Sequence, residues 1–228
     1  MRRNKDEHWM SISDLMSGLM MVFMLIAIAY MMEVDQQRQK QNEIIEEYSV
    51  IKHEIYLDLN EEFKADLLKW NAEIDESTLA ITFKEPDILF SRGSDALTPQ
   101  FKNVLDDFFP RYIKILSQEK YRDNIEEIRI EGHTDPYWQG AVDRKDEYEK
   151  NMVLSQSRTR TVLNYAINLP VLQDKLEWMI SKITANGLSS SQPIVTNGIV
   201  DDTRSRRVEF RVRTNADERL NDLQEGLR

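Results

Sequence analysis

The stretch MSISDLMSGLMMVFMLIAIAYMM, residues 10–32, decides the organisation of the chain because nearly all of it is apolar and Asp14 is its one charged residue. As a helix rising about 1.5 Å per residue, it would be roughly 34 Å long, which matches a bilayer hydrocarbon core of about 30 Å. A cleaved signal peptide needs a shorter apolar region and small residues at its end, whereas this run ends in Tyr30, Met31 and Met32. The sequence therefore predicts a transmembrane helix over residues 10–32.

Basic residues lie before this run, and acidic residues come first after it. Arg2 and Arg3 precede the run, whereas Glu33 and Asp35 follow it. Cytoplasmic flanks of membrane helices carry an excess of Lys and Arg. The sequence therefore predicts a single-pass protein of the bacterial inner membrane, with residues 1–9 as a cytoplasmic tail and everything after the helix in the periplasm.

Asp14 is a carboxylate within an apolar segment. Such a residue costs on the order of 2.5 to 3.5 kcal/mol on insertion scales and commonly marks an ion or proton pathway. Its small neighbours are Ser11, Ser13, Ser17 and Gly18, and small residues let a partner helix approach closely. We expect Asp14 to bind a cation, with Ser13 and Ser17 lining the pathway. The alternative is a carboxylate that only reaches the membrane surface, and the choice between proton and sodium stays open.

The remainder of the 228-residue chain is highly charged, and its composition excludes several classes of function. The formal net charge of −10 argues against nucleic-acid binding, which needs a dense Lys/Arg surface. Cysteine is absent, so neither a disulfide scaffold nor a thiolate metal site can form. The histidines are widely spaced and predict no metal site. No nucleophile or phosphate-loop motif predicts a catalytic residue, an enzyme or a cofactor.

Residues 33–75 form a charged connecting segment. Its apolar residues recur in steps of three or four, at Ile44, Tyr48, Ile51, Ile55, Leu59 and Phe63. This spacing is typical of one face of a helix, and it predicts a long amphipathic helix over residues 33–70. Two partners for that face are open: a second copy of the chain, or the C-terminal domain of the same chain.

Residues 76–214 alternate between strand and helix patterns, and residues 215–228 form a tail. Strands are predicted at 79–83, 88–90, 127–131 and 207–213, and helices from Thr98–Pro99 onward and over 149–168 and 171–184. With the preceding helices, this order predicts an α+β fold in which helices pack on one face of a mixed sheet.

The segment WMSISDLMSGLM, residues 9–20, resembles the B subunits of ion-driven rotary stators, the MotB family. Asp14 falls on the ion-binding aspartate of that family. The resemblance implies a homodimer within a ring of five multi-span subunits of the MotA or ZorA type, and a plug formed by the first part of residues 33–75. The short N-terminal tail and the residues around Asp14 are more similar to the ZorB branch, from Zorya anti-phage systems, than to the flagellar branch.

Four pieces of the C-terminal region resemble the OmpA-like peptidoglycan-binding domain. They are residues 89–97, 130–135, 151–158 and 206–210, which include Gly-His-Thr-Asp, Asn-x-x-Leu-Ser-x-x-Arg and Arg-Arg-Val-Glu. Four pieces in the family's order indicate the same sandwich of helices on a sheet.

The resemblance implies that Asp135 and Arg158 hold the diaminopimelate of the peptide stem, with Thr134, Asn151 and Arg207 also at the site. A carboxylate suits the ammonium of this zwitterion, and a guanidinium suits its carboxylate. The alternative is an intramolecular salt bridge between Asp135 and Arg158 without a ligand.

Residues 136–150 depart from the OmpA-like pattern because this loop is longer than is usual for the family. The loop contains Tyr137 and Trp138. We expect these two aromatic side chains to cover the ligand or to change which ligand is bound.

Three functions are therefore compatible with the sequence. The first is the B subunit of a proton-driven rotary motor anchored to peptidoglycan, of the ZorB type. The second is a flagellar stator subunit, and the third is a passive tether between membrane and cell wall. Asp14 separates the motors from the tether, because a tether needs no ion-binding residue.

Overall fold

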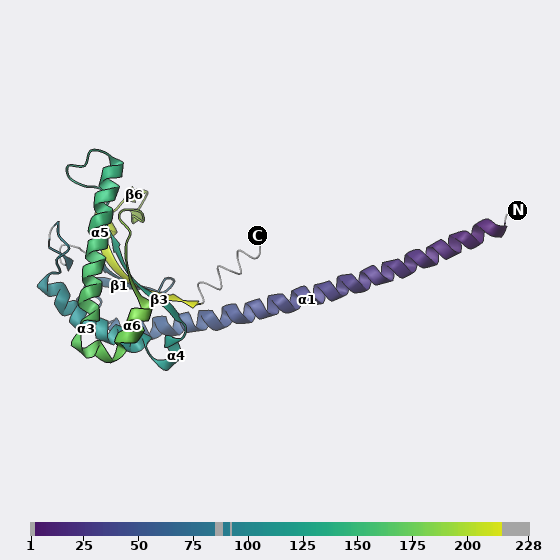
Figure 1. Cartoon of the computed structure of the whole chain (residues 1–228), viewed down its shortest axis with the longest axis horizontal. Helices are drawn as coiled ribbons and strands as arrows, with labels where there is room; N and C mark the ends of the chain where they lie inside the picture. The colour runs from purple at the N-terminus through teal and green to yellow at the C-terminus, as the bar shows by residue number, and fades with distance from the viewer. Residues whose placement is uncertain (1–2, 85–88, 92, 216–228) are drawn as a thin grey trace. The chain divides into compact units, whose positions relative to one another are not determined.

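The computed structural model describes residues 3–84, 89–91 and 93–215, and the side chains of residues 3–14 and 40–49 lie outside this description. The chain divides into two compact units, Met1–Glu47 and Tyr48–Arg228, which are described one at a time. Figure 1 shows the long helix α1 (Arg3–Phe63) and the elements of the second unit.

The first unit consists of the N-terminal part of α1. Among the described residues, one helical segment is long and apolar enough to cross a membrane: Leu15–Gln39, with a mean hydropathy of 2.2. Its apolar side chains are exposed, with Leu15 at 73% and Leu25 at 67%. An apolar surface of this length is stable only against lipid or partner helices. The expected apolar N-terminal helix is therefore confirmed.

The last turns of α1 belong to the second unit, where their apolar face enters the core. Ile55, Leu59 and Phe63 are fully buried, and Ile51 packs partly against the same cluster. The face predicted from the spacing of residues 51–63 is thus packed on the chain's own domain. The side chains of residues 44 and 48, at the start of that face, lie outside the described residues.

The helix ends at Phe63, earlier than residue 70, and α3 (Pro99–Leu116) holds this end in place. Arg111 of α3 donates from Nε to Glu62 Oε1 at 2.7 Å and from Nη1 to Asp66 Oδ2 at 3.0 Å. Its guanidinium carbon also lies 5.0 Å from the centre of the Phe63 ring. These contacts attach the end of α1 to the domain.

A five-stranded mixed sheet forms the centre of the second unit. Its order is β1-β2-β7-β3-β4, with bounds β1 Ala72–Asp75, β2 Ala80–Lys84, β3 Ile125–His133, β4 Ile183–Gly187 and β7 Arg207–Thr214. β3 and β4 are parallel, and the other neighbours are antiparallel. β5 (Val195–Thr196) and β6 (Ile199–Val200) form a separate hairpin.

Helices cover one face of this sheet (Figure 1). They are α3, α4 (Glu119–Arg122), α5 (Arg144–Ile167) and α6 (Leu176–Lys182), with the 3₁₀ turn η1 (Pro170–Lys175), while α7 (Asp202–Ser205) precedes β7. Alternation along β7 buries Val208, Phe210 and Val212. The ring of Phe210 lies 5.1 Å from that of Phe108 on α3. The predicted α+β architecture is confirmed.

Most predicted elements are present, but the region after α5 differs. The prediction of a helix over 171–184 is wrong, because η1 and α6 divide this segment, α6 ends at Lys182, and β4 begins at Ile183. Thr98 caps α3 as predicted, accepting a bond from the Phe101 N–H at 3.1 Å. Of the strand predicted at 88–90, residue 88 lies outside the described residues, and Phe90 forms an isolated bridge with Leu97.

Candidate functional site

The ends of β3 and β4 lie unusually close to helix α5. One glycine in each strand, Gly132 in β3 and Gly187 in β4, permits this contact. A Cβ atom on Gly132 would lie 2.7 Å from Thr159 Cγ2, and one on Gly187 would lie 2.2 Å from the Gln156 backbone nitrogen. Both distances are below normal van der Waals separation, so larger residues would push α5 away from the sheet. The close contact brings the first half of α5 to the residues that follow β3.

Asp135 follows the end of β3, and three contacts hold it. Its Oδ2 atom accepts a bond from Arg206 Nη1 at 2.9 Å, and its Oδ1 atom accepts one from the Tyr137 N–H at 3.0 Å. The Asn151 side chain, on α5, donates to the Asp135 backbone carbonyl at 3.2 Å. Arg206 and Tyr137 thus orient the carboxylate, and Asn151 fixes the backbone that carries it.

Arg158 lies two turns further along α5 and is held against the loop before α3. Its Nε donates to the Ser94 carbonyl at 3.0 Å, and its guanidinium carbon lies 4.8 Å from the centre of the Phe90 ring. A guanidinium carries five N–H donors in a planar fork, which suits it to bidentate contact with a carboxylate.

These residues line one pocket of about 500 Å³. Its lining consists of Gly93, Thr134, Asp135, Tyr137, Trp138, Gln139, Asn151, Leu154, Arg158 and Arg206, and the group is called the Asp135 pocket below. Four predicted site residues, Thr134, Asp135, Asn151 and Arg158, therefore come together. Three of the lining residues, 137–139, come from the segment 136–150, which is a loop up to residue 143 and forms the first turns of α5 from Arg144 onward.

Thr134 contributes a buried hydroxyl to this lining. Its backbone N–H donates to the Ser189 carbonyl at 2.9 Å. Within the part of the chain that the structure describes, its Oγ1 atom is buried and has no hydrogen-bond partner. A buried hydroxyl without a partner is costly, so this atom favours a site that is completed by a polar ligand.

Arg207, the fifth predicted site residue, is not part of the Asp135 pocket. Its Nε donates to Glu209 Oε1 at 2.5 Å, and its Nη1 donates to the Ser205 carbonyl at 3.2 Å. Neighbouring residues at the start of a strand point in different directions. Arg206 consequently reaches Asp135, while Arg207 enters the sheet face opposite the helices. Sequence reasoning had noted the Arg-Arg pair and selected the second member.

A second titratable cluster lies on that opposite sheet face. Glu131, His133 and Glu209 are buried, and their ligand-type atoms lie within 4.8 Å of one another. His133 Nε2 is 4.0 Å from Glu131 Oε2 and 3.9 Å from Glu209 Oε1. The histidine spacing had predicted no such group, because Glu209 joins it only through the pairing of β3 with β7.

Arginines already balance the charge of this cluster. Arg207 pairs with Glu209, and Arg211 Nη2 lies 3.1 Å from Glu209 Oε2. Burial, followed by repulsion from Arg207, lowers the pKa of His133 to about 4. Burial raises the pKa of Glu131; it also opposes ionisation of Glu209, but Arg207 and His133 offset this and the pKa of Glu209 is lowered. A neutral histidine among paired carboxylates favours a structural ion network over a cation site.

The predicted ion-pathway residues lie on α1. The side chains of Asp14 and Ser13 lie outside the described residues, whereas Ser17 is described and exposed. The roles of all three therefore stay predictions.

An acidic and a basic side chain converge at the strand end of a helix-covered mixed sheet, in a chain whose N-terminal helix is apolar. This arrangement defines a membrane-linked α+β binding domain. The profile of the OmpA family matches residues 89–207, so the chain belongs to the OmpA family. Zorya protein ZorB of Escherichia coli is 49% identical over 213 residues, which cover 93% of this chain and 90% of that protein, and the chain shares a family with it.

A solved structure supports the same fold. A putative MotB like protein from Desulfovibrio vulgaris superposes with a TM-score of 0.53 at 24% identity, covering 76% of this chain and 98% of that one. The similarity of these two chains concerns the fold alone.

Proposed function

We propose that this chain is the B subunit of a proton-driven rotary membrane motor that is anchored to peptidoglycan, and that it serves as the ZorB component of a Zorya anti-phage system. The identity to ZorB of Escherichia coli extends over 93% of the chain and thus includes most of the apolar helix. The observation that carries the anchoring role is the Asp135 pocket, in which Arg158 and the Asp135–Arg206 pair line one cavity.

The Asp135 pocket suits the zwitterionic end of diaminopimelate. Each oxygen of the Asp135 carboxylate already accepts one bond, from Arg206 and from Tyr137. A carboxylate has about four acceptor positions, so an incoming ammonium needs to displace neither partner. The guanidinium group of Arg158 supplies donors for the ligand carboxylate. We assign the stem peptide to this pocket for that reason.

The apolar helix supplies the motor role. In our proposal the N-terminus is cytoplasmic, the helix crosses the inner membrane once, and the C-terminal domain is periplasmic. Asp14 takes up and releases a proton, with Ser13 and Ser17 beside it, between two copies of this chain and a ring of five multi-span subunits of the ZorA type. An ionisable residue at this depth is stable only when partner helices shelter it. The first part of residues 33–75 acts as a plug.

Anchoring is tested by sedimenting the full chain, in detergent, with purified peptidoglycan sacculi. Asp135→Asn keeps the size of the side chain but removes its charge, and we expect roughly tenfold weaker binding or worse, since hydrogen bonds to charged groups contribute about 1.5 to 3 kcal/mol. Asp174→Asn is the matched control, because the Asp174 side chain is 72% exposed and lies outside the pocket. Equal sedimentation of both variants would refute the anchoring site.

Ion use is tested by phage plaque counts on cells that carry the complete system. Asp14→Asn should remove protection while the complex still assembles in pull-downs. Asp174→Asn, the same change at an exposed position of the second unit, should leave protection intact. Protection that survives Asp14→Asn would contradict the motor function and would favour a passive tether between membrane and cell wall.

A further inference from the structure

We propose that a second pocket beside the Asp135 pocket binds the sugar ring that bears the peptide stem, with the Trp138 indole as its stacking surface. This inference rests on the proposed peptidoglycan-binding function and extends it from the peptide to the glycan. It concerns a pocket of about 550 Å³, called the Trp138 pocket below.

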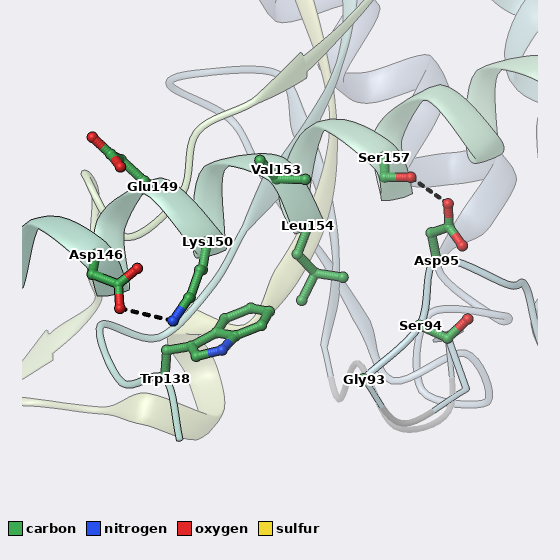
Figure 2. Close-up of a pocket in the computed structure, with 10 residues that line it drawn as sticks. All are labelled: Gly93, Ser94, Asp95, Trp138, Asp146, Glu149, Lys150, Val153, Leu154 and Ser157. Atoms are coloured by element: carbon green, nitrogen blue, oxygen red, sulfur yellow. Dashed lines mark hydrogen bonds and ion pairs between the residues drawn. The ribbon is translucent and has the colours of Figure 1, made fainter. Parts of the chain in front are cut away.

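The Trp138 pocket lies between the loop before α3, the loop 136–143 and the first turns of α5. Its lining consists of Gly93, Ser94, Asp95, Trp138, Asp146, Glu149, Lys150, Val153, Leu154 and Ser157 (Figure 2). Gly93, Trp138 and Leu154 also line the Asp135 pocket. The two pockets are therefore neighbours that share a wall, and one extended ligand can occupy both.

Polar groups with fixed positions surround the indole. Figure 2 shows the Trp138 ring below α5, close to Lys150 and Leu154. Lys150 Nζ lies 2.7 Å from Asp146 Oδ2, and the Ser157 hydroxyl donates to Asp95 on the opposite side. An aromatic face offers a surface for the C–H groups of a sugar ring, while carboxylate, ammonium and hydroxyl groups bond its hydroxyls and acetamide. Trp138 itself is half-buried, so one part of its ring remains accessible.

The charge of the Trp138 pocket selects against anionic ligands. Asp95, Asp146 and Glu149 oppose a single lysine, Lys150. A phosphate or a lipid headgroup would meet an excess of negative charge. A muramic acid unit whose lactyl group is amide-linked to the stem carries no charge, and it suits this pocket better.

The distance between sugar and diaminopimelate also fits two adjoining pockets. Diaminopimelate is the third residue of the stem, so two residues separate it from the sugar. Two extended residues span about 7 Å, and the diaminopimelate side chain adds to this, so the sugar lies within roughly 15 Å of the group that contacts Asp135. The Trp138 pocket shares lining residues with the Asp135 pocket and is therefore near enough to receive the sugar.

Two probes test the proposal on the full chain in detergent, by titration calorimetry: the free stem tripeptide, and the same tripeptide attached to its disaccharide. We expect the disaccharide form to bind about 3- to 10-fold more tightly, the range of one aromatic stacking contact. Trp138→Ala and Lys150→Gln should remove this advantage. Lys150 lines the Trp138 pocket but not the Asp135 pocket, so its variant separates the glycan contact from the peptide site.

Tyr137→Ala is the matched control, because Tyr137 is a neighbouring aromatic residue that lines only the Asp135 pocket. The ratio of its dissociation constants for the two probes should equal the ratio measured for the wild type. Equal binding of both probes to the wild type, or an advantage that survives Trp138→Ala, would overturn the glycan site while the peptide site stands. If neither probe binds, the proposed anchoring function fails together with this inference.

Discussion

The Asp135 carboxylate and the Arg206 guanidinium lie 2.9 Å apart, from Oδ2 to Nη1, although 71 residues separate them in the chain. The contact joins the segment after β3 to the segment before β7. Because β3 and β7 are antiparallel neighbours, the end of β3 lies beside the start of β7, and the two segments meet there. The pairing of strands thus positions the acidic group of the candidate site.

Arg206 should act mainly by positioning Asp135. Arg206→Gln removes the ion pair, and we expect the affinity for sacculi to fall by about 3- to 10-fold, less than for Asp135→Asn, since the ligand-binding carboxylate remains. Sedimentation at several protein concentrations measures this. Arg204→Gln, at an exposed neighbouring position, is the control. A loss as large as that of Asp135→Asn would show that Arg206 binds the ligand itself.

Arg111 should determine how firmly the end of α1 is attached to the domain. Arg111→Met removes its bonds to Glu62 and Asp66 but keeps most of the aliphatic volume. We expect a loss of roughly 1 to 3 kcal/mol in the free energy of unfolding, because each carboxylate loses a charged partner. Urea titration followed by near-ultraviolet circular dichroism measures it.

The control for that experiment is Arg122→Met. In the wild type, Arg122 Nε lies 3.7 Å from Asp123 Oδ1, which is farther than Arg111 lies from its partners, and both side chains are at least half-exposed. It should change the free energy of unfolding by less than about 0.5 kcal/mol. Equal effects of the two variants would contradict the attachment role of Arg111.

His133 should make the domain less stable in mild acid. Burial and Arg207 lower the pKa of His133 to about 4 from its usual 6.5. Between these values the unfolded chain binds a proton that the folded chain does not, so stability falls as pH decreases from about 6.5 toward 4. The loss approaches roughly 3 kcal/mol at pH 4. Urea titrations at pH 7, 5.5 and 4 measure the trend.

His133→Gln provides the comparison for this pH dependence. Burial raises the pKa of Glu131, so this residue stabilises the folded state as the pH falls. The effect is present in both the wild type and the variant, and it therefore largely cancels in the difference between their free energies of unfolding. The difference between wild type and variant should change steadily with pH. A constant difference across the range would contradict a neutral, buried His133.

The sequence predicted those elements whose pattern is strong. Alternation in Val208, Phe210 and Val212 identified β7, and Thr98 followed by Pro99 identified the start of α3. β4 was missed because it has five residues, of which only Ile183 is large and apolar, and it takes its strand form from parallel pairing with β3. The β5–β6 hairpin had a usable sequence signal, the Asn197-Gly198 pair, which is typical of a type I′ turn. Both residues have the positive φ that this turn requires.

The candidate site was predictable where its residues belong to motifs. Thr134, Asp135, Asn151 and Arg158 came from family resemblance, and the structure brings them together. Arg206 was not selected, because a strand's first residue and its predecessor cannot be told apart from sequence. The Trp138 pocket and the partnership of Glu209 with His133 depend on packing and on strand register, which a single sequence does not specify.

Recognition of diaminopimelate by the Asp135 pocket is the central claim, and one competition measurement tests it most directly. The full chain is bound to sacculi and challenged with a stem tripeptide that ends in meso-diaminopimelate or in lysine, which lacks the second carboxylate. We predict that the diaminopimelate peptide releases the protein at concentrations at least about tenfold lower, because only this peptide offers the Arg158 guanidinium a carboxylate beside the side-chain ammonium. Equal release by both peptides, or release by neither, would contradict the account.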